Sequence, residues 1–172
     1  MKMPAGAVTE VTIRPVAACD IDAVRAVLIA TWHATYDGTL GSAKVDEVTA
    51  SWHSHDALAR QAEARDAVFL LAEDAGGGVL GCGFTRLLGA GRLDLGQLYV
   101  LPRAQGRRIG TRLLGRLLGA FPQAKSVRLE VEPRNTRAIA FYRRAGFEVV
   151  GAGSDCCGRG SGLAHVVMEK PL

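Results

Sequence analysis

The chain has 172 residues, 48% of them hydrophobic, with 21 basic and 17 acidic side chains and a net charge of +4. This length suits one domain, expected across residues 1–172 with its core at about 11–170. No apolar run is long enough to cross a bilayer and the start lacks a signal-peptide core, so we expect a soluble, cytoplasmic protein with no membrane partner. The modest basic excess lacks the dense stripes of a nucleic-acid-binding surface, so nucleic acid is not an expected partner.

Hydrophobic periodicity and turn residues predict strands and helices that alternate along the chain. In chain order we expect a strand at 11–16, a helix that Asp20 caps and that runs to about Trp32, and one or two short helices within 33–66. Strands at 67–74, 79–88 and 93–101 follow, then a helix at about 110–121 and a strand at 126–131. The chain continues with a helix from Asn135 or Thr136 that Gly146 ends, and with strands at 147–151 and 163–170.

This order predicts an α/β fold with a single mixed, mostly antiparallel central sheet flanked by helices. The strands at 67–74 and 79–88 are separated by a glycine-rich turn and should form a hairpin. The segment at about 93–131 reads as strand, helix and strand, which predicts a parallel, right-handed crossover.

A segment rich in glycine and arginine joins the strand at 93–101 to the helix that follows it. The first N–H groups of a helix lack internal partners and the helix dipole makes that end positive, so a helix start favours anions. Gly106 and Gly110 let the backbone approach a ligand closely. Arg107 and Arg108 add positive charge, and Thr111 adds a hydroxyl group. The segment therefore predicts a phosphate site; the alternative is a plain connection with solvated arginines.

Two common phosphate loops do not fit this spacing. A Walker A loop requires a lysine after its last glycine, whereas Gly110 is followed by Thr111 and Arg112. The glycine spacing also differs from a dinucleotide-binding fingerprint.

The segment LYVLPRAQGRRIG resembles the pyrophosphate loop of the GNAT superfamily of acyl-CoA N-acetyltransferases. The signature of that family runs Gln/Arg-x-x-Gly-x-Gly/Ala, and this chain has Gln105, Gly106, Ile109 and Gly110 in place. Arg108 stands where the family has its central glycine.

Two further segments support the resemblance. VEPRNTRAIAFYRRAGFEVVG (131–151) is similar to the second motif of the family, and VTIRPV with TWHATYDG looks like the first strand and helix of many bacterial members. The resemblance implies the GNAT, or acyl-CoA N-acyltransferase, fold. It also implies an enzyme that moves an acetyl group from acetyl-CoA to an amine by direct attack on the thioester.

The resemblance implies roles for individual residues as well. A backbone N–H at or near Val100 would stabilise the oxyanion, and the hydroxyl group of Tyr142 would protonate the CoA sulfur. Asn135 would hold the pantetheine, cap its helix, or do both. Asp94 is the candidate general base, with an ordered water as the alternative. The expected cofactor-binding set is Val100, Leu101, Gln105, Gly106, Arg107, Arg108, Ile109, Gly110, Thr111 and Asn135.

The acceptor is left open by the sequence. A small-molecule primary amine is the leading hypothesis, a protein N-terminus or lysine is the second, and an acyl-CoA sensor without turnover is the third. His33 and Tyr36 either line the pocket or pack in the core. The resemblance also leaves a homodimer open.

The remaining histidines and cysteines do not have the spacing of a metal site, and none is expected. His53 and His55 at i, i+2 do not share a helix face, so we expect solvated helix residues. His165 is expected to be structural. Cys156 and Cys157 are either reactive or, as the simpler interpretation, reduced loop thiols.

Overall fold

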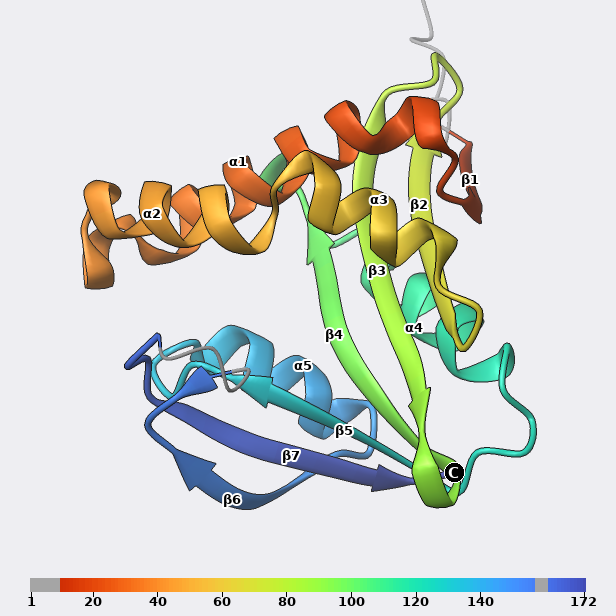
Figure 1. The fold of residues 1–172 in the computed structure, drawn as a ribbon, viewed down its shortest axis with the longest axis vertical. Helices are drawn as coiled ribbons and strands as arrows, with labels where there is room; N and C mark the ends of the chain where they lie inside the picture. Colours follow the sequence, from red (N-terminus) through yellow and green to blue (C-terminus); the bar gives the residue numbers. More distant parts are fainter. Residues whose placement is uncertain (1–9, 157–160) are drawn as a thin grey trace, which may run out of the picture.

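The computed structural model describes residues 10–156 and 161–172, and its centre is an open sheet (Figure 1). Seven strands among these residues lie in the order β1-β2-β3-β4-β5-β7-β6. Their bounds are β1 Val11–Pro15, β2 Ala67–Asp74, β3 Val79–Leu88, β4 Arg92–Val100, β5 Ser126–Val131, β6 Glu148–Gly153 and β7 His165–Pro171. The pair β4–β5 is parallel and the other paired strands of the described chain are antiparallel. The predicted mixed sheet and its parallel crossover are therefore confirmed.

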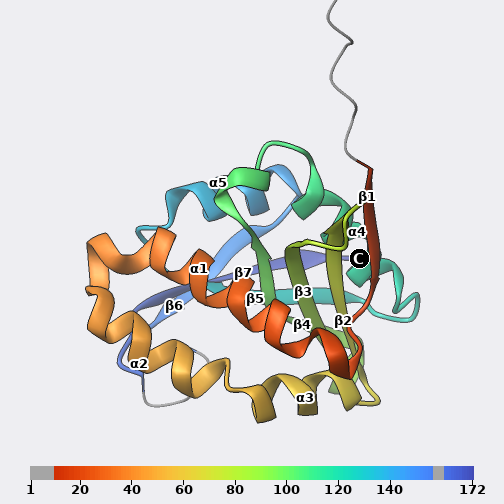
Figure 2. The same cartoon turned by 90° about the horizontal axis from the view of Figure 1, so that it is seen from above.

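Helices cover both faces of the sheet (Figure 2). Their bounds are α1 Ile21–Leu40, α2 Ser42–Trp52, α3 His55–Glu63, α4 Ile109–Gly119 and α5 Thr136–Arg144, with short 3₁₀ turns at Ala18–Asp20, Gly89–Gly91 and Pro102–Ala104. Successive side chains of β2 point to opposite faces. Phe69 and Leu71 pack with buried residues of α1 and α3, whereas Leu70 and Ala72 pack with those of α4. The sheet thus has a core on each face.

The strands β4 and β5 stay together over only a short distance. Residues 92–94 pair with 126–128, and beyond that point β4 continues beside β3 while β5 continues beside β7 (Figure 1). A bulge lies where they part, because consecutive residues Phe84 and Thr85 of β3 face Gln97 and Leu95, which leaves Gly96 as the extra residue. Bulges bend a strand and increase its twist, which agrees with β4 turning away from β5.

The first helix is longer than the sequence pattern predicts. It continues past Trp32 to Leu40 and ends where Gly41 adopts φ 82°. His33 and Tyr36 therefore lie within α1 rather than after it. The segment 33–66, predicted as one or two short helices, consists of the end of α1 followed by α2 and α3. Trp32 and Tyr36 of this longer helix are buried in one cluster with Val45 and Val48 of α2, so packing between α1 and α2 stabilises the extension.

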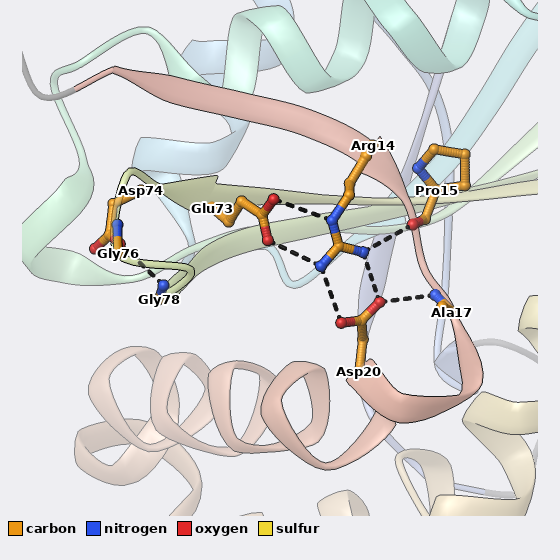
Figure 3. Close-up of polar contacts among 8 residues, drawn as sticks. All are labelled: Arg14, Pro15, Ala17, Asp20, Glu73, Asp74, Gly76 and Gly78. Carbon is orange, nitrogen blue, oxygen red and sulfur yellow. Dashed lines mark hydrogen bonds and ion pairs between the residues drawn. The ribbon is translucent and has the colours of Figure 1, made fainter.

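Asp20 was expected to cap the first helix, but its carboxylate has different partners (Figure 3). It accepts hydrogen bonds from the Ala17 backbone N–H at 2.8 Å and from Arg14 Nη1 at 2.7 Å. Arg14 also donates to both carboxylate oxygens of Glu73, at 2.8 and 3.0 Å. Hydrogen bonding to Arg14 lowers the pKa of Asp20. This cluster fastens β1 to β2 and to the start of α1.

Candidate active site

A cavity of about 680 Å³ lies where β4 and β5 part. Its walls come from α1, the end of α2, β4, the segment 104–111, β5, α5 and residues 163–164. Most of the predicted site residues line it, namely Val100, Gln105, Gly106, Arg108, Ile109, Gly110, Thr111, Asn135 and Tyr142. The fold therefore brings together residues of two sequence motifs that are separate along the chain.

The loop before α4 has two residues in the left-handed region of backbone space. Gly106 has φ 80°, and Arg108 has φ 59° with ψ 15°. Left-handed φ is costly for a residue with a Cβ atom, so a glycine would adopt this conformation more readily than Arg108. Arg108 adopts this conformation nevertheless and forms the N-cap of α4.

The N-terminus of α4 opens into the cavity. The first intrahelical bond runs from the Arg112 N–H to the Arg108 carbonyl at 3.0 Å. The N–H groups of Ile109, Gly110 and Thr111 precede it and so have no intrahelical acceptor. All three residues line the cavity. This end of α4 combines free backbone donors with a positive dipole, which is the arrangement that holds a phosphate group.

At the end of β4, successive backbone N–H groups point to opposite edges of the strand. The Leu101 N–H donates to the Leu80 carbonyl at 2.9 Å and therefore faces β3. Because N–H directions alternate along a strand, the N–H of Val100 points to the opposite edge, where β5 has parted from β4. The side chain of Gln105 donates to the Val100 carbonyl at 2.8 Å and holds the loop against the strand.

Tyr142 lies in α5 with its ring in the core and one edge at the cavity. Its ring centroid is 5.2 Å from that of Phe141 and 5.4 Å from that of Phe147. Burial raises the pKa of Tyr142 well above the ordinary tyrosine value, and the neighbouring Tyr36 raises it further. The hydroxyl group is therefore protonated at neutral pH and can act as a proton donor.

Asn135 connects α5 to α1 across the cavity. Its Oδ1 accepts a hydrogen bond from the Ala138 N–H at 3.1 Å, so the predicted helix cap is present. Its Nδ2 donates to the hydroxyl oxygen of Tyr36 at 3.3 Å. Tyr36 both packs in the core and lines the cavity, so the two alternatives drawn from the sequence are combined in one residue.

Three of the predicted site residues lie outside the cavity lining. Leu101 and Arg107 are not among the lining residues, and the Leu101 N–H is already bonded to β3. Asp94 sits at the last paired step of β4 and β5, opposite Arg128. Partial desolvation of its carboxyl group, followed by the charge of Glu130, raises the pKa of the exposed residue Asp94. A proton transfer between Asp94 and a group in the cavity would require an intervening water.

His53 differs from its prediction. It follows α2 and is only 3% exposed, whereas a solvated position was expected. Its ring makes edge contacts with Trp32 and Tyr99, with centroids 5.9 and 6.4 Å apart. The burial comes from α2 folding back on α1, which the local sequence pattern does not indicate. His55 is exposed, as predicted.

Several cavity residues carry no signal in the sequence. Gln97 is 5% exposed and donates to Gln61 Oε1 at 3.1 Å. Trp52 from α2 and the carboxylates Glu130 and Glu132 from the region of β5 also line the cavity. The bulge places Gln97 next to the parting strands, but neither its position nor α2 belongs to a recognisable motif.

The open sheet, its parting parallel pair and the helix N-terminus between them define the class of acyl-CoA N-acyltransferase folds. A family model described as Acetyltransferase (GNAT) family matches residues 30–147, and the chain belongs to this family of acetyltransferases. No helix of the described residues has the length and apolar character needed to span a bilayer.

Similar proteins include two that are named mycothiol acetyltransferase. The protein from Mycobacterium sp. (strain JLS) is 38% identical over 111 residues, which cover 57% of this chain and 36% of that protein. The protein from Mycolicibacterium vanbaalenii is 36% identical over 141 residues, which cover 68% and 46%. The chain thus spans between about a third and a half of the length of these relatives.

Among solved structures, the PaiA N-acetyltransferase of Thermoplasma acidophilum in complex with coenzyme A has the same fold. Its TM-score is 0.80 at 24% identity, over 95% of this chain and 99% of that one.

Proposed function

We propose that the chain transfers an acetyl group from acetyl-CoA to a primary amine of a small molecule by direct attack on the thioester. The observation that carries the proposal is the N-terminus of α4, whose free backbone donors open into the cavity between β4 and β5. Membership of the GNAT family and the name of the mycothiol acetyltransferases support it.

The loop and helix start are the proposed site of the CoA diphosphate. The N–H groups of Ile109, Gly110 and Thr111 would donate to its oxygens, and the guanidinium group of Arg108 would add charge from the cavity wall. Gln105 holds this loop on β4 through the Val100 carbonyl. The Val100 N–H would then donate to the thioester oxygen as it becomes an oxyanion, an interaction typically worth about 10²–10³ in rate.

Two proton transfers complete the proposed reaction. An alkylammonium acceptor has a pKa of about 10.4 and must lose a proton before it attacks. Asp94 is proposed as the base acting through an ordered water, because it lies outside the cavity lining. Tyr142 is proposed to donate its proton to the departing CoA thiolate, since its raised pKa keeps it protonated.

The aromatic residues at the proposed acceptor end support a small-molecule acceptor. This side of the cavity is lined by Trp32, Trp52 and His53. Asn135, at the start of α5, donates a hydrogen bond to the hydroxyl oxygen of Tyr36 in α1. A protein N-terminus or a lysine side chain would need a groove open along its length. The alternative of an acyl-CoA sensor would keep the cofactor loop and lack turnover.

The proposal is tested by mixing the protein with acetyl-CoA and a panel of amines, with a thiol reagent to detect released CoA and mass spectrometry to detect acetylated product. The expected result is CoA release that depends on the amine, with a product 42 Da heavier, as an acetyl group replacing hydrogen requires (about 42 Da). Acetyl-CoA binding without turnover on any amine would favour the sensor. Absence of acetyl-CoA binding would reject the cofactor site.

A further inference from the structure

Three potential metal ligands lie close together at the cavity, two of them in its wall. They are Glu130 of β5, Cys156 after β6 and His165 at the start of β7, and one ligand atom from each lies within 4.8 Å of the others. None of them belongs to the motifs that define the cofactor loop. Glu130 and Cys156 line the cavity, and His165 lies behind them.

The imidazole of His165 is buried with one ring nitrogen that makes no hydrogen bond to the described residues. Its side chain is 8% exposed, and its Nδ1 atom has no hydrogen-bond partner among the described residues. Its Nε2 atom is 3.8 Å from Glu130 Oε1, which is longer than a hydrogen bond. Buried polar groups are normally hydrogen-bonded, so a buried imidazole in this state calls for a partner of another kind.

The imidazole of His165 fits beside β6 because a glycine, Gly153, lies opposite it. Gly153 of β6 pairs with His165, and a Cβ atom at Gly153 would come within 2.5 Å of Cε1 and 2.7 Å of Nε2. Such distances are far below van der Waals contact. The absence of a side chain at residue 153 therefore permits the observed position of the imidazole beside Glu130.

We propose that Glu130, Cys156 and His165 bind a Zn²⁺ ion. A thiolate, an imidazole and a carboxylate are the three ligand types that zinc takes in proteins, at about 2.3 Å for sulfur and about 2.0–2.2 Å for nitrogen and oxygen. Ligand atoms on one tetrahedral ion lie roughly 3.3–3.8 Å apart by these bond lengths, so no pair in the cluster needs to close by more than about 1.5 Å. The thiol of Cys156 releases its proton to solvent on binding.

The charges of this site balance. The carboxylate of Glu130 and the thiolate of Cys156 together neutralise the two charges of the ion, and His165 binds as the neutral imidazole. Three protein ligands leave one position of a tetrahedral ion open. Because two of the three ligand residues line the cavity, that position faces it. A bound ion would thus present a coordination site to an amine or thiol that enters the cavity.

The first test is a titration of the full chain, without a histidine tag, with Co²⁺ as a spectroscopic substitute for Zn²⁺. We expect one ion per chain, a thiolate-to-cobalt charge-transfer band in the near ultraviolet, and displacement of Co²⁺ by Zn²⁺. Cys156→Ser should abolish the band. Cys19→Ser, at an exposed cysteine, and Cys157→Ser should retain it.

The second test uses two glycines of β6. Gly153→Ala should weaken Zn²⁺ binding at least tenfold, because the added methyl group displaces the imidazole of His165. Gly151→Ala is the matched control, since its Cβ atom would only make an ordinary 3.9 Å contact with Val167, and it should change the affinity less than threefold. Far-ultraviolet circular dichroism and thermal unfolding verify that each variant folds.

Three results would overturn the proposal. They are a wild-type protein without a charge-transfer band, a band that survives in Cys156→Ser, and equal zinc affinity in Gly153→Ala and Gly151→Ala. The experiment contains no acetyl-CoA, so its failure would leave the proposed acetyl transfer standing, and failure of acetyl transfer would leave the zinc site standing.

Discussion

The two ends of the cavity are built in different ways. The end at α4 consists largely of backbone groups from one short segment, 105–111. The end at which we propose that the acceptor binds consists of side chains from α1, α2, β4 and residues 163–164, which are far apart along the chain. A backbone site of this kind leaves a local pattern of glycines and a helix start, whereas the side-chain site depends on how distant elements pack. The same difference determines how each end should respond to substitution.

The largest expected effect is at the α4 end. In Gly110→Glu, a carboxylate is placed among the N–H donors that would hold the diphosphate, and the residue also lies against Phe141, with a Cβ contact of 3.6 Å. Repulsion and crowding should lower acetyl-CoA affinity at least 100-fold, measured by isothermal titration calorimetry.

Gly115→Glu is the matched control on the same helix. Gly115 is exposed, and a Cβ atom there would meet nothing within 4 Å. Gly115→Glu adds the same charge and replaces the same residue type in the same helix, but away from the cavity. Acetyl-CoA affinity should therefore change less than threefold. Equal loss in both variants would mean that the charge acts at long range or that α4 is disrupted, and the diphosphate would have to be placed elsewhere.

Tyr142→Phe should have the next largest effect, on turnover alone. The substitution removes the hydroxyl group and keeps the ring packed between Phe141 and Phe147. Loss of a general acid typically costs about 10²–10⁴ in rate, so kcat should fall about 100-fold while acetyl-CoA affinity changes less than threefold. Steady-state kinetics and calorimetry separate the two quantities.

Tyr99→Phe serves as a control for Tyr142→Phe, because Tyr99 also lines the cavity but comes from β4. Wild-type turnover in Tyr142→Phe would remove the acid role. A matching fall in acetyl-CoA affinity would indicate that the hydroxyl group binds the cofactor and does not act as the acid.

The sequence was sufficient for the sheet, and most residues of the loop that it singled out before α4 line the cavity. Alternating apolar residues and the glycine turn predicted β2 and β3, and the segment 93–131 predicted the only parallel pair among the described strands. Helix length was less accurate, because α1 continues beyond Trp32 through contacts with α2 that come from tertiary packing. Local propensity carries no information about such contacts.

The acceptor end was largely invisible in the sequence for the same reason. His53 was predicted to be solvated, and it is buried because α2 folds against α1 and brings it beside Trp32. Gln97 lines the cavity next to a bulge at Gly96, which the sequence pattern did not predict. Cys156 is half-buried at the cavity wall, while Cys157 lies outside the described residues. Each of these positions depends on contacts between segments distant in sequence.

Trp52→Ala tests the acceptor end and should have a moderate effect. Trp52 lines the cavity and its ring lies 5.6 Å from that of Trp32 in an edge arrangement. Removing it takes apolar contact from the acceptor, so the acceptor KM should rise about tenfold, equivalent to about 1.4 kcal/mol. Acetyl-CoA affinity should stay within threefold. A variant that loses cofactor affinity and keeps its acceptor KM would contradict the division of the cavity into two ends.

The smallest expected effect is on stability, at the point where β4 and β5 part. The pKa of Asp94 in the folded chain is raised above the ordinary 3.8, so folding disfavours the ionised carboxylate. The folded chain is favoured while this carboxyl group is neutral, and that stabilisation is lost as pH rises from about 3.8 through the raised pKa. Asp94→Asn should then stabilise the protein at pH 7.

The gain in Asp94→Asn should be less than about 1 kcal/mol, because solvent screens an exposed residue, and the Tm should rise by no more than about 3 °C. The difference from wild type should shrink as pH falls toward 4, as both proteins then carry a neutral group at this position. Asp56→Asn, at an 86% exposed carboxylate in the first turn of α3, should not be stabilising, since it removes a favourable interaction with the helix dipole. A lower Tm for Asp94→Asn at pH 7 would show that the carboxylate stabilises the pairing of β4 with β5. Favourable interactions with the surrounding arginines would then have to outweigh the cost of desolvating the carboxylate.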